Sequence, residues 1–194
     1  MKVMLGIILA VTLAGVASAQ EPAGSEIKDR RENQQDRIAN GIASGQLTAG
    51  ETTKVEKQES KVNKEVAKDR AANGGNLTNN EKRQINGQQN KLSKEIYNDK
   101  HNAATQKYGN NEVDRRRENQ QDRIANGVKS GQLTAGETAR LEGKESKINK
   151  EVSADRKANG GNLTNKEKAQ VNRQQNRESA RIYNKKHNAA VGPH

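Results

Sequence analysis

The sequence predicts an all-α protein built from two tandem three-helix modules, an elongated bundle or coiled-coil-like assembly with a thin core. Three observations lead to this prediction: a long internal repeat, apolar residues at helical spacing, and helix-start motifs at fixed intervals. Residues Arg31–Ala104 realign onto Arg117–Ala190 at an offset of 86 positions, and about three quarters of the 74 aligned residues are identical. Each segment, together with the residues just before it that align at the same offset, is called copy one or copy two below.

Each copy contains a shorter repeat in its apolar residues. Downstream of Leu47 and of Leu77, apolar residues follow at steps of 8, 7 and 4 positions. Steps of 7 and 4 place side chains on one helix face. The stripe is as narrow as a coiled-coil seam, and Glu59 and Gln89 interrupt it. Its members are Leu47, Val55, Val62 and Val66; Leu77, Ile85, Leu92 and Ile96; Leu133, Leu141, Ile148 and Val152; and Leu163, Val171 and Ile182, with Glu178 in place of the counterpart of Leu92.

Thr-x-x-Glu motifs mark where helices begin. In this capping box the threonine caps the helix and the glutamate reaches back to the threonine N–H. The four pairs are Thr48/Glu51, Thr78/Glu81, Thr134/Glu137 and Thr164/Glu167. With the apolar stripes they predict helices at about 28–43, 49–72, 79–102, 114–129, 135–158 and 165–188. The short loops between these helices predict antiparallel neighbours.

The N-terminus predicts an exported protein. Lys2 is followed by an apolar run from Val3 to Val16 and by the small residues Ala17, Ser18 and Ala19. This pattern is typical of a signal peptide cleaved after Ala19, which gives a periplasmic or secreted chain. The predicted organisation is therefore a signal peptide at 1–19, module one at 20–104, a linker at 105–116, module two at 117–190 and a tail at 191–194.

The composition limits the core and favours anionic partners. After residue 20 there are 22 Leu, Ile and Val residues and no Phe, Trp or Cys. We expect no disulfide, no cofactor and no membrane-spanning segment in the mature chain. The formal net charge is +11, of which Lys2 supplies one. Such a surface favours an anionic polymer or a membrane surface as partner, and self-association through the helices is a further expectation.

Seven arginines are the predicted polyanion-binding residues. They lie in the Gln- and Asn-rich segments that open each copy, and arginine suits bidentate contacts with phosphate and carboxylate. The alternative is a solvated helix face in which the interspersed Asp and Glu balance the charge. The seven are Arg30, Arg31, Arg37, Arg115, Arg116, Arg117 and Arg123.

The Gly-x-Leu-Thr-x-x-Glu segments also resemble the second half of an EF-hand calcium loop. In that alternative Glu51, Glu81, Glu137 and Glu167 are metal ligands. The first half of the loop does not match, because position 1 of the second loop is Arg70. The capping box accounts for the same residues without a metal, and we predict no metal site.

One Tyr/His pair lies at the end of the third helix in each copy. Tyr97 and His101, like Tyr183 and His187, lie four residues apart and can share a helix face. A weak metal or haem contact is one interpretation. The other is a partly buried tyrosine that closes the apolar stripe, with a histidine near the helix end. Nothing else is typical of an active site, so we expect no enzyme.

The repeated RENQQDRIANG and SGQLTAGET segments, within Arg31–Gln58 and Arg117–Lys144, resemble small exported helical-repeat proteins of bacteria. The resemblance implies a helical periplasmic or secreted protein and brings no activity with it. Three hypotheses follow. The first is an envelope or extracellular protein whose basic helices bind anionic surfaces. The second is a degenerate EF-hand-like calcium-binding protein. The third is a structural or stress-protective protein without a specific ligand.

Overall fold

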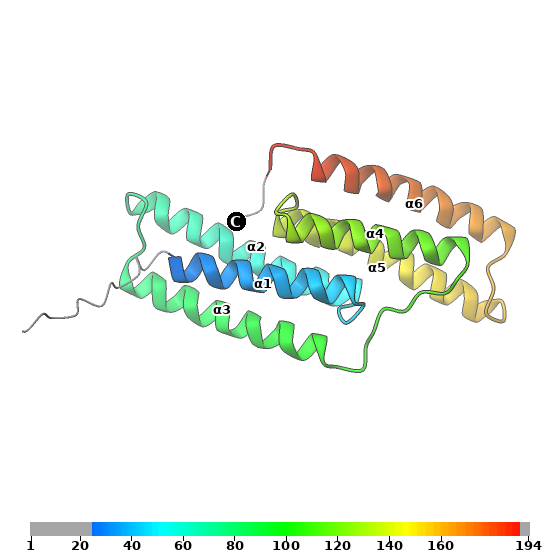
Figure 1. Ribbon diagram of the computed structural model, residues 1–194, viewed down its shortest axis with the longest axis horizontal. Coiled ribbons are helices and arrows are strands. Elements are labelled where there is room, and N and C mark those ends of the chain that lie inside the picture. The colour runs from blue at the N-terminus through cyan, green and yellow to red at the C-terminus, as the bar shows by residue number, and fades with distance from the viewer. Residues whose placement is uncertain (1–24, 191–194) are drawn as a thin grey trace, which may run out of the picture.

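Six α-helices and no strand make up residues 25–190, the part of the chain that the computed structural model describes (Figure 1). The predicted signal peptide at 1–19 and tail at 191–194 lie outside these residues. Every helix begins and ends within three residues of its predicted position. The helices are α1 (Ser25–Ala43), α2 (Ala49–Ala72), α3 (Asn79–Lys100), α4 (Glu112–Lys129), α5 (Ala135–Ala158) and α6 (Asn165–Lys186).

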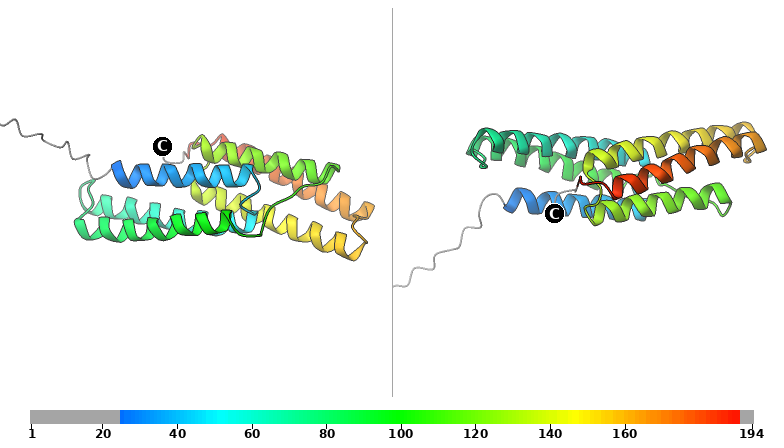
Figure 2. Two further views of the ribbon diagram at one scale, coloured as in Figure 1. Left: turned by 60° about the horizontal axis from the view of Figure 1, so that its bottom comes forward. Right: turned by 90° about the horizontal axis from the view of Figure 1, so that it is seen from above.

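The two copies pack against each other through their first and second helices. α1 lies along α4 and α2 lies along α5, whereas α3 and α6 lie at opposite corners of an elongated molecule (Figures 1 and 2). α2 and α5 run antiparallel, because Gly50 lies against Ser146 and Gly136 lies against Ser60. These equivalent contacts define an approximate two-fold axis that passes near Val55.

One apolar cluster at this axis draws on both copies, so the six helices form a single packed domain. Two smaller clusters lie farther out, one in each copy, around Ile85 and Val171. Every Leu, Ile and Val between residues 27 and 182 is buried. The members of the central cluster are Ile38, Ala39, Ile42, Leu47, Val55, Leu92, Ile96, Ile124, Ala125, Val128, Leu133, Leu141 and Ile182.

All four predicted capping boxes are present. At the start of α2 the Thr48 N–H donates to Glu51 Oε2 at 2.9 Å, and the Glu51 N–H donates to Thr48 Oγ1 at 3.3 Å. Asn102, after the end of α3, donates to Glu51 Oε1 at 2.6 Å. Asn188 makes the same contact with Glu137. The caps thus start the second helix of each copy and also tie it to the end of the third.

The end of α1 and the loop that follows it each require a glycine. A methyl group on Gly41 would lie 2.7 Å from the Leu47 side chain, which folds back against α1. Gly45 has φ +68°, a conformation that side chains disfavour. Its carbonyl accepts a hydrogen bond from the Gln106 N–H at 2.8 Å. The segment that joins the copies is therefore fastened to the loop of copy one.

The two helix-end tyrosines are exposed, so the expectation that they are partly buried and close the stripe is wrong. Tyr97 and Tyr183 are each 57% exposed. The neighbouring residues Ile96 and Ile182 take the inward positions, and successive residues on a helix point about 100° apart. Among residues 25–190, no helix is long and apolar enough to cross a membrane.

Candidate polyanion-binding surface

The seven predicted arginines do not form one open patch. Arg37 donates to the Ser93 carbonyl oxygen at 3.0 Å, and its counterpart Arg123 donates to the Ser179 carbonyl oxygen at 3.1 Å. These bonds fasten the first helix of each copy to the third. Both arginines, like Arg30 and Arg116, are only partly exposed, and Arg115 alone of the seven is fully on the surface.

Arg117 is the most deeply placed of the seven. It is 5% exposed and donates to Asp114 Oδ1 at 2.9 Å and to Asn149 Oδ1 at 2.7 Å. Its guanidinium lies 5.2 Å from the centre of the Tyr108 ring. Arg156 binds the other oxygen of Asp114 at 2.9 Å. Arg117 therefore makes its contacts in the interior of copy two.

Arg31, the counterpart of Arg117 in copy one, is partly exposed and lies beside Glu59. Burial lowers the pKa of Arg31, and the neighbouring Arg70 adds to that effect. No carboxylate stands where copy two has Asp114, because the equivalent residue is Lys28, which is exposed and pairs with Glu32.

The four glutamates of the calcium alternative act as capping residues. The backbone N–H and hydroxyl of Thr78 hold the pKa of Glu81 below its usual value, and Thr164 does the same for Glu167. Burial would raise the pKa of Glu137, but hydrogen bonds from Asn188 and Thr134 lower it overall. Within residues 25–190, no group of three or more His, Asp or Glu side chains could hold a metal ion.

The Tyr/His pairs form two exposed stacks. The ring centres of Tyr97 and His101 are 4.2 Å apart, and those of Tyr183 and His187 are equally close. His101 Nδ1 lies 2.7 Å from the Tyr97 carbonyl oxygen. Neither histidine belongs to a group of three or more possible metal ligands among the described residues.

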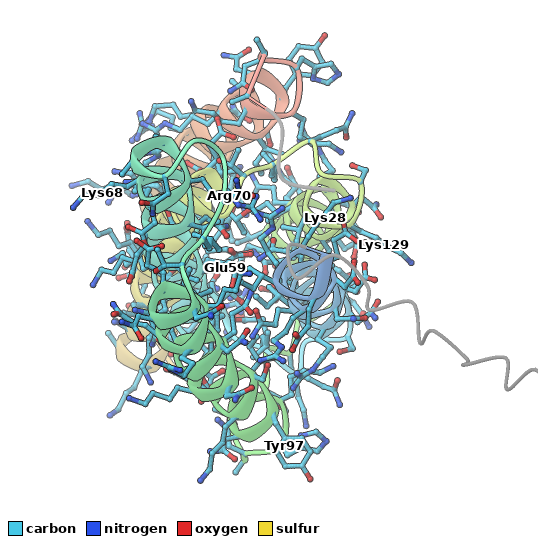
Figure 3. All side chains as sticks on the ribbon, turned by 90° about the vertical axis from the view of Figure 1, so that its left-hand side faces the viewer. Lys28, Glu59, Lys68, Arg70, Tyr97 and Lys129 are labelled. Atoms are coloured by element: carbon cyan, nitrogen blue, oxygen red, sulfur yellow. The ribbon has the colours of Figure 1, made fainter. Side chains whose placement is uncertain are left out.

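The glutamates that interrupt the apolar stripe face the interior of the molecule. Glu56 and Glu59 on α2, and their counterparts Glu142 and Glu145 on α5, are fully buried. Figure 3 shows Glu59 pointing from α2 toward α1, into the space between the helices. In copy two Glu178 on α6 joins them, 1% exposed, where copy one has Leu92.

These carboxylates have few partners. Gln35 donates to Glu56 Oε2 at 3.3 Å, and Gln121 donates to Glu142 Oε2 at 3.1 Å. Asn63 is the neighbouring donor that lowers the pKa of Glu59, whereas neither oxygen of Glu145 accepts a hydrogen bond in the described structure.

Burial favours the protonated, uncharged form of these glutamates. It raises the pKa of Glu59 to about 7, against the effect of Arg31. Burial and the adjacent Glu178 raise the pKa of Glu145 to about 8. Burial raises the pKa of Glu56 and of Glu142 well above the usual value.

The outward faces of α2 and α5 carry lysines instead. On α2 the basic residues recur at steps of 3 and 4, which keeps them on one side of the helix. Figure 3 shows Lys68 projecting from the outer side of α2, away from Lys28 and Lys129. All ten basic residues are exposed and form the lysine row: Lys54, Lys57, Lys61, Lys64 and Lys68 on α2, and Arg140, Lys144, Lys147, Lys150 and Lys157 on α5.

A groove of about 470 Å³ lies where the two halves of the row meet. Gly143 and Gly50 form part of its wall, so the α2 and α5 backbones come close there. Its basic side chains are Lys57, Arg140, Lys144, Lys147 and Lys150, and no carboxylate lines it. A second groove of about 430 Å³ shares Lys150 and adds Lys157.

The acidic residues flanking the row differ between the copies. In copy one Glu95 pairs with Lys54 and accepts from Gln58 at 2.6 Å. The residues of copy two equivalent to Glu95 and Asp99 are Arg181 and Lys185. On α6, Arg181 lines a further groove of about 300 Å³ beside Lys144 and Lys147, and Glu151 and Glu178 also line this groove. Arg181 pairs with Glu178, and Lys185 pairs with Glu137.

The lysine row was missed in the sequence, although a signal for it is present. Its residues lie on the α2 and α5 faces opposite the apolar stripe, at the same helical spacing. The sequence also shows that the acidic residues of these helices fall within or beside the stripe, as Glu59 does. The clustered arginines led to the prediction that the first helix of each copy binds polyanions. Most of these arginines instead make contacts within the protein.

No family model, curated protein or solved structure matches the chain.

Proposed function

We propose that this is an exported, non-enzymatic protein that binds anionic polymers along the lysine row of α2 and α5. The groove between the two helices carries the proposal, because it gathers five basic side chains and has no carboxylate in its lining. Lysine binds phosphate and sulfate as a point charge. Binding of this kind depends on the ligand's charge and little on its sequence.

The inward placement of the glutamates supports the same function. A helix with as many acids as α2 would present a mixed surface if its carboxylates faced solvent. Here Glu56 and Glu59 lie in the interior, and the lysines face outward. Burying carboxylates costs free energy, so this separation of charge has a stability cost that a function of the basic face would explain.

The test is retention on heparin as the salt concentration rises. A groove variant with Lys57, Lys144, Lys147 and Lys150 changed to Gln should elute at much lower salt than the unchanged protein. A control variant removes four exposed lysines outside the row by changing Lys91, Lys94, Lys166 and Lys168 to Gln. Because total charge falls equally in both, the control should elute close to the unchanged protein.

The slope of log K against log salt gives a second readout. Each anionic contact contributes about 0.7 to 0.9 to its magnitude. Loss of the four groove lysines should lower the slope by about 3 on the same scale. Equal behaviour of the groove and control variants would contradict the proposal. No retention of the unchanged protein at low salt would favour the structural hypothesis instead.

A further inference from the structure

We infer that the ligand of the lysine row is a single extended chain of closely spaced phosphate or sulfate groups, bound across both copies at once. This inference rests on the proposed function and goes beyond it, because it fixes the shape and the minimum length of the ligand. It also assigns a role to the duplication: each copy supplies half of one continuous site.

The antiparallel packing of α2 and α5 sets the length of the row. Gly50 lies against Ser146 and Gly136 lies against Ser60, so the two halves of the row meet near the two-fold axis. From there the row runs outward along α2 to Lys68 and in the opposite direction along α5 to Lys157. At about 1.5 Å per helical residue, the whole row is about 45 Å long.

The width of the row favours a chain over a membrane surface. The basic side chains lie along two antiparallel helices that are in contact near the two-fold axis. Half-buried acids lie beside them: Glu65 on α2 and Glu151 on α5. Each of these acids accepts hydrogen bonds from two glutamines of the next helix. A helix that lies on a membrane adds apolar side chains beside its basic ones. The exposed large apolar residues in 25–190 are Tyr97 and Tyr183, on α3 and α6.

The same surroundings argue against recognition of single-stranded nucleic acid. Proteins that bind it add aromatic side chains on which the bases stack. Neither α2 nor α5 contains an aromatic residue. The third tyrosine, Tyr108, has its hydroxyl buried beside Arg117 and does not reach the row. The row thus offers charge and length and nothing that reads bases.

Binding to both halves has a measurable consequence. When one chain engages two linked sites, the second contact forms at high effective concentration, and affinity rises steeply with the length of the ligand until both sites are filled. A chain that covers one half gains nothing from the other half. The affinity should therefore rise steeply as the chain grows to about 45 Å and then level off, apart from the statistical gain of a longer lattice.

The experiment measures the affinity for polyphosphate fractions with extended lengths of about 15, 45 and 90 Å, chosen from the 45 Å row. Heparin fragments of the same lengths form a second arm, which separates phosphate from sulfated sugar as the source of the charge. From 15 to 45 Å the affinity should rise on the order of 100-fold. From 45 to 90 Å it should rise less than about threefold.

Two half-row variants locate the contacts. One changes Lys57, Lys61 and Lys64 to Gln, and the other changes Lys144, Lys147 and Lys150 to Gln. Either should reduce the affinity for the 45 Å chain on the order of 10-fold or more. The α2 variant should reduce the affinity for the 15 Å chain by no more than a few-fold, because it leaves four of the five basic side chains of the groove in place. Circular dichroism confirms that both variants are folded.

Three results would overturn the inference. One is equal affinity for the short and long chains together with loss of both in the groove variant, which would keep the proposed function and leave one compact site. A second is an unchanged affinity for the 45 Å chain in either half-row variant. The third is tighter binding, per anionic group, to vesicles of anionic lipid than to the 45 Å chain. If the unchanged protein binds no chain of any length, the proposed function itself fails.

Discussion

Copy one and copy two share three quarters of their aligned residues and the same helix boundaries, yet their interiors differ where charge is buried. Copy two contains Asp114, held between Arg117 and Arg156, and adds the buried Glu178. Copy one has Lys28 and Leu92 at these positions. Because both copies form equivalent helices, the fold accommodates either set of side chains at these positions.

The comparison shows which features the fold requires. Both copies keep the capping boxes, the apolar stripe, and a buried pair of glutamates facing a buried glutamine. Gln34 and Gln120 also make equivalent bonds to backbone carbonyl oxygens of the third helix, at 2.7 and 2.8 Å. These shared features define the module, whereas the buried acids that pair with arginine, Asp114 and Glu178, belong to copy two.

The largest predicted effect breaks the carboxylate network of copy two. Asp114→Ala leaves Arg117, which is 5% exposed, without its charge partner. Removing one partner of a buried ion pair costs about 3–5 kcal/mol. The free energy of unfolding, measured with urea, should fall by that amount. Lys28→Ala is the matched control and should change it by less than about 0.5 kcal/mol, because Lys28 is exposed. Similar losses in both variants would contradict the difference between the copies.

A smaller effect follows from exchanging the residues at the Leu92 position. Glu178→Leu gives copy two the side chain of copy one and removes a buried carboxyl. Replacing a buried charged or polar group with a well-packed apolar one is often stabilising by about 1–4 kcal/mol. Its partner Arg181 is half exposed and remains hydrated. We expect the urea midpoint to rise for Glu178→Leu and to fall for Leu92→Glu. A fall in both would show that copy two requires Glu178.

The smallest effect, counted per group and per pH unit, is a dependence of stability on pH. Glu59 and Glu145 have folded pKa values of about 7 and about 8, raised from 4.5. The folded state therefore holds protons that the unfolded state releases. This stability is complete below about pH 4.5 and is lost as pH rises through the folded pKa, by at most about 1.4 kcal/mol per pH unit for each group. Asp114, with a lowered pKa, stays ionised over this range.

Urea midpoints from pH 5 to pH 9 test this prediction, and they should fall with rising pH. Glu145→Gln should flatten the fall between pH 7 and 8 more than Glu59→Gln does, since the pKa of Glu59 lies lower. Glu56 and Glu142 continue to contribute in both variants. A midpoint that rises from pH 5 to pH 8 would show that these carboxyls are ionised in the folded protein.

The sequence predicted the helices well because local signals set their ends. Thr48 and Glu51 lie three residues apart and form their cap without help from the rest of the chain. The apolar spacing from Leu47 to Val66 likewise predicts which face is buried. The pairing of α2 with α5 could not be predicted in this way. It depends on the contact between Gly50 and Ser146, which are nearly a hundred residues apart. Small residues such as these do not indicate, in the sequence, which helix they will contact.

The proposed binding surface, the lysine row, was harder to predict because the burial of a charge depends on tertiary contacts. Arg117 and Arg115 look alike in the sequence, but one lies under Tyr108 and the other is exposed. Glu59 appeared only as an interruption of a stripe. Its complete burial follows from the packing of α2 against α5, α3 and α1, which separates the acids from the lysines on the same helix.

Lysine footprinting tests the central claim most directly. The protein is treated with an amine-reactive acetylating reagent with and without a 45 Å polyphosphate chain, a length set by the row, and modification of each lysine is read by mass spectrometry. We predict strong protection of Lys57, Lys144, Lys147 and Lys150 and little change at Lys91 and Lys94 on α3. Equal protection of all surface lysines, or protection confined to Lys28 and Lys129 on α1 and α4, would contradict the account.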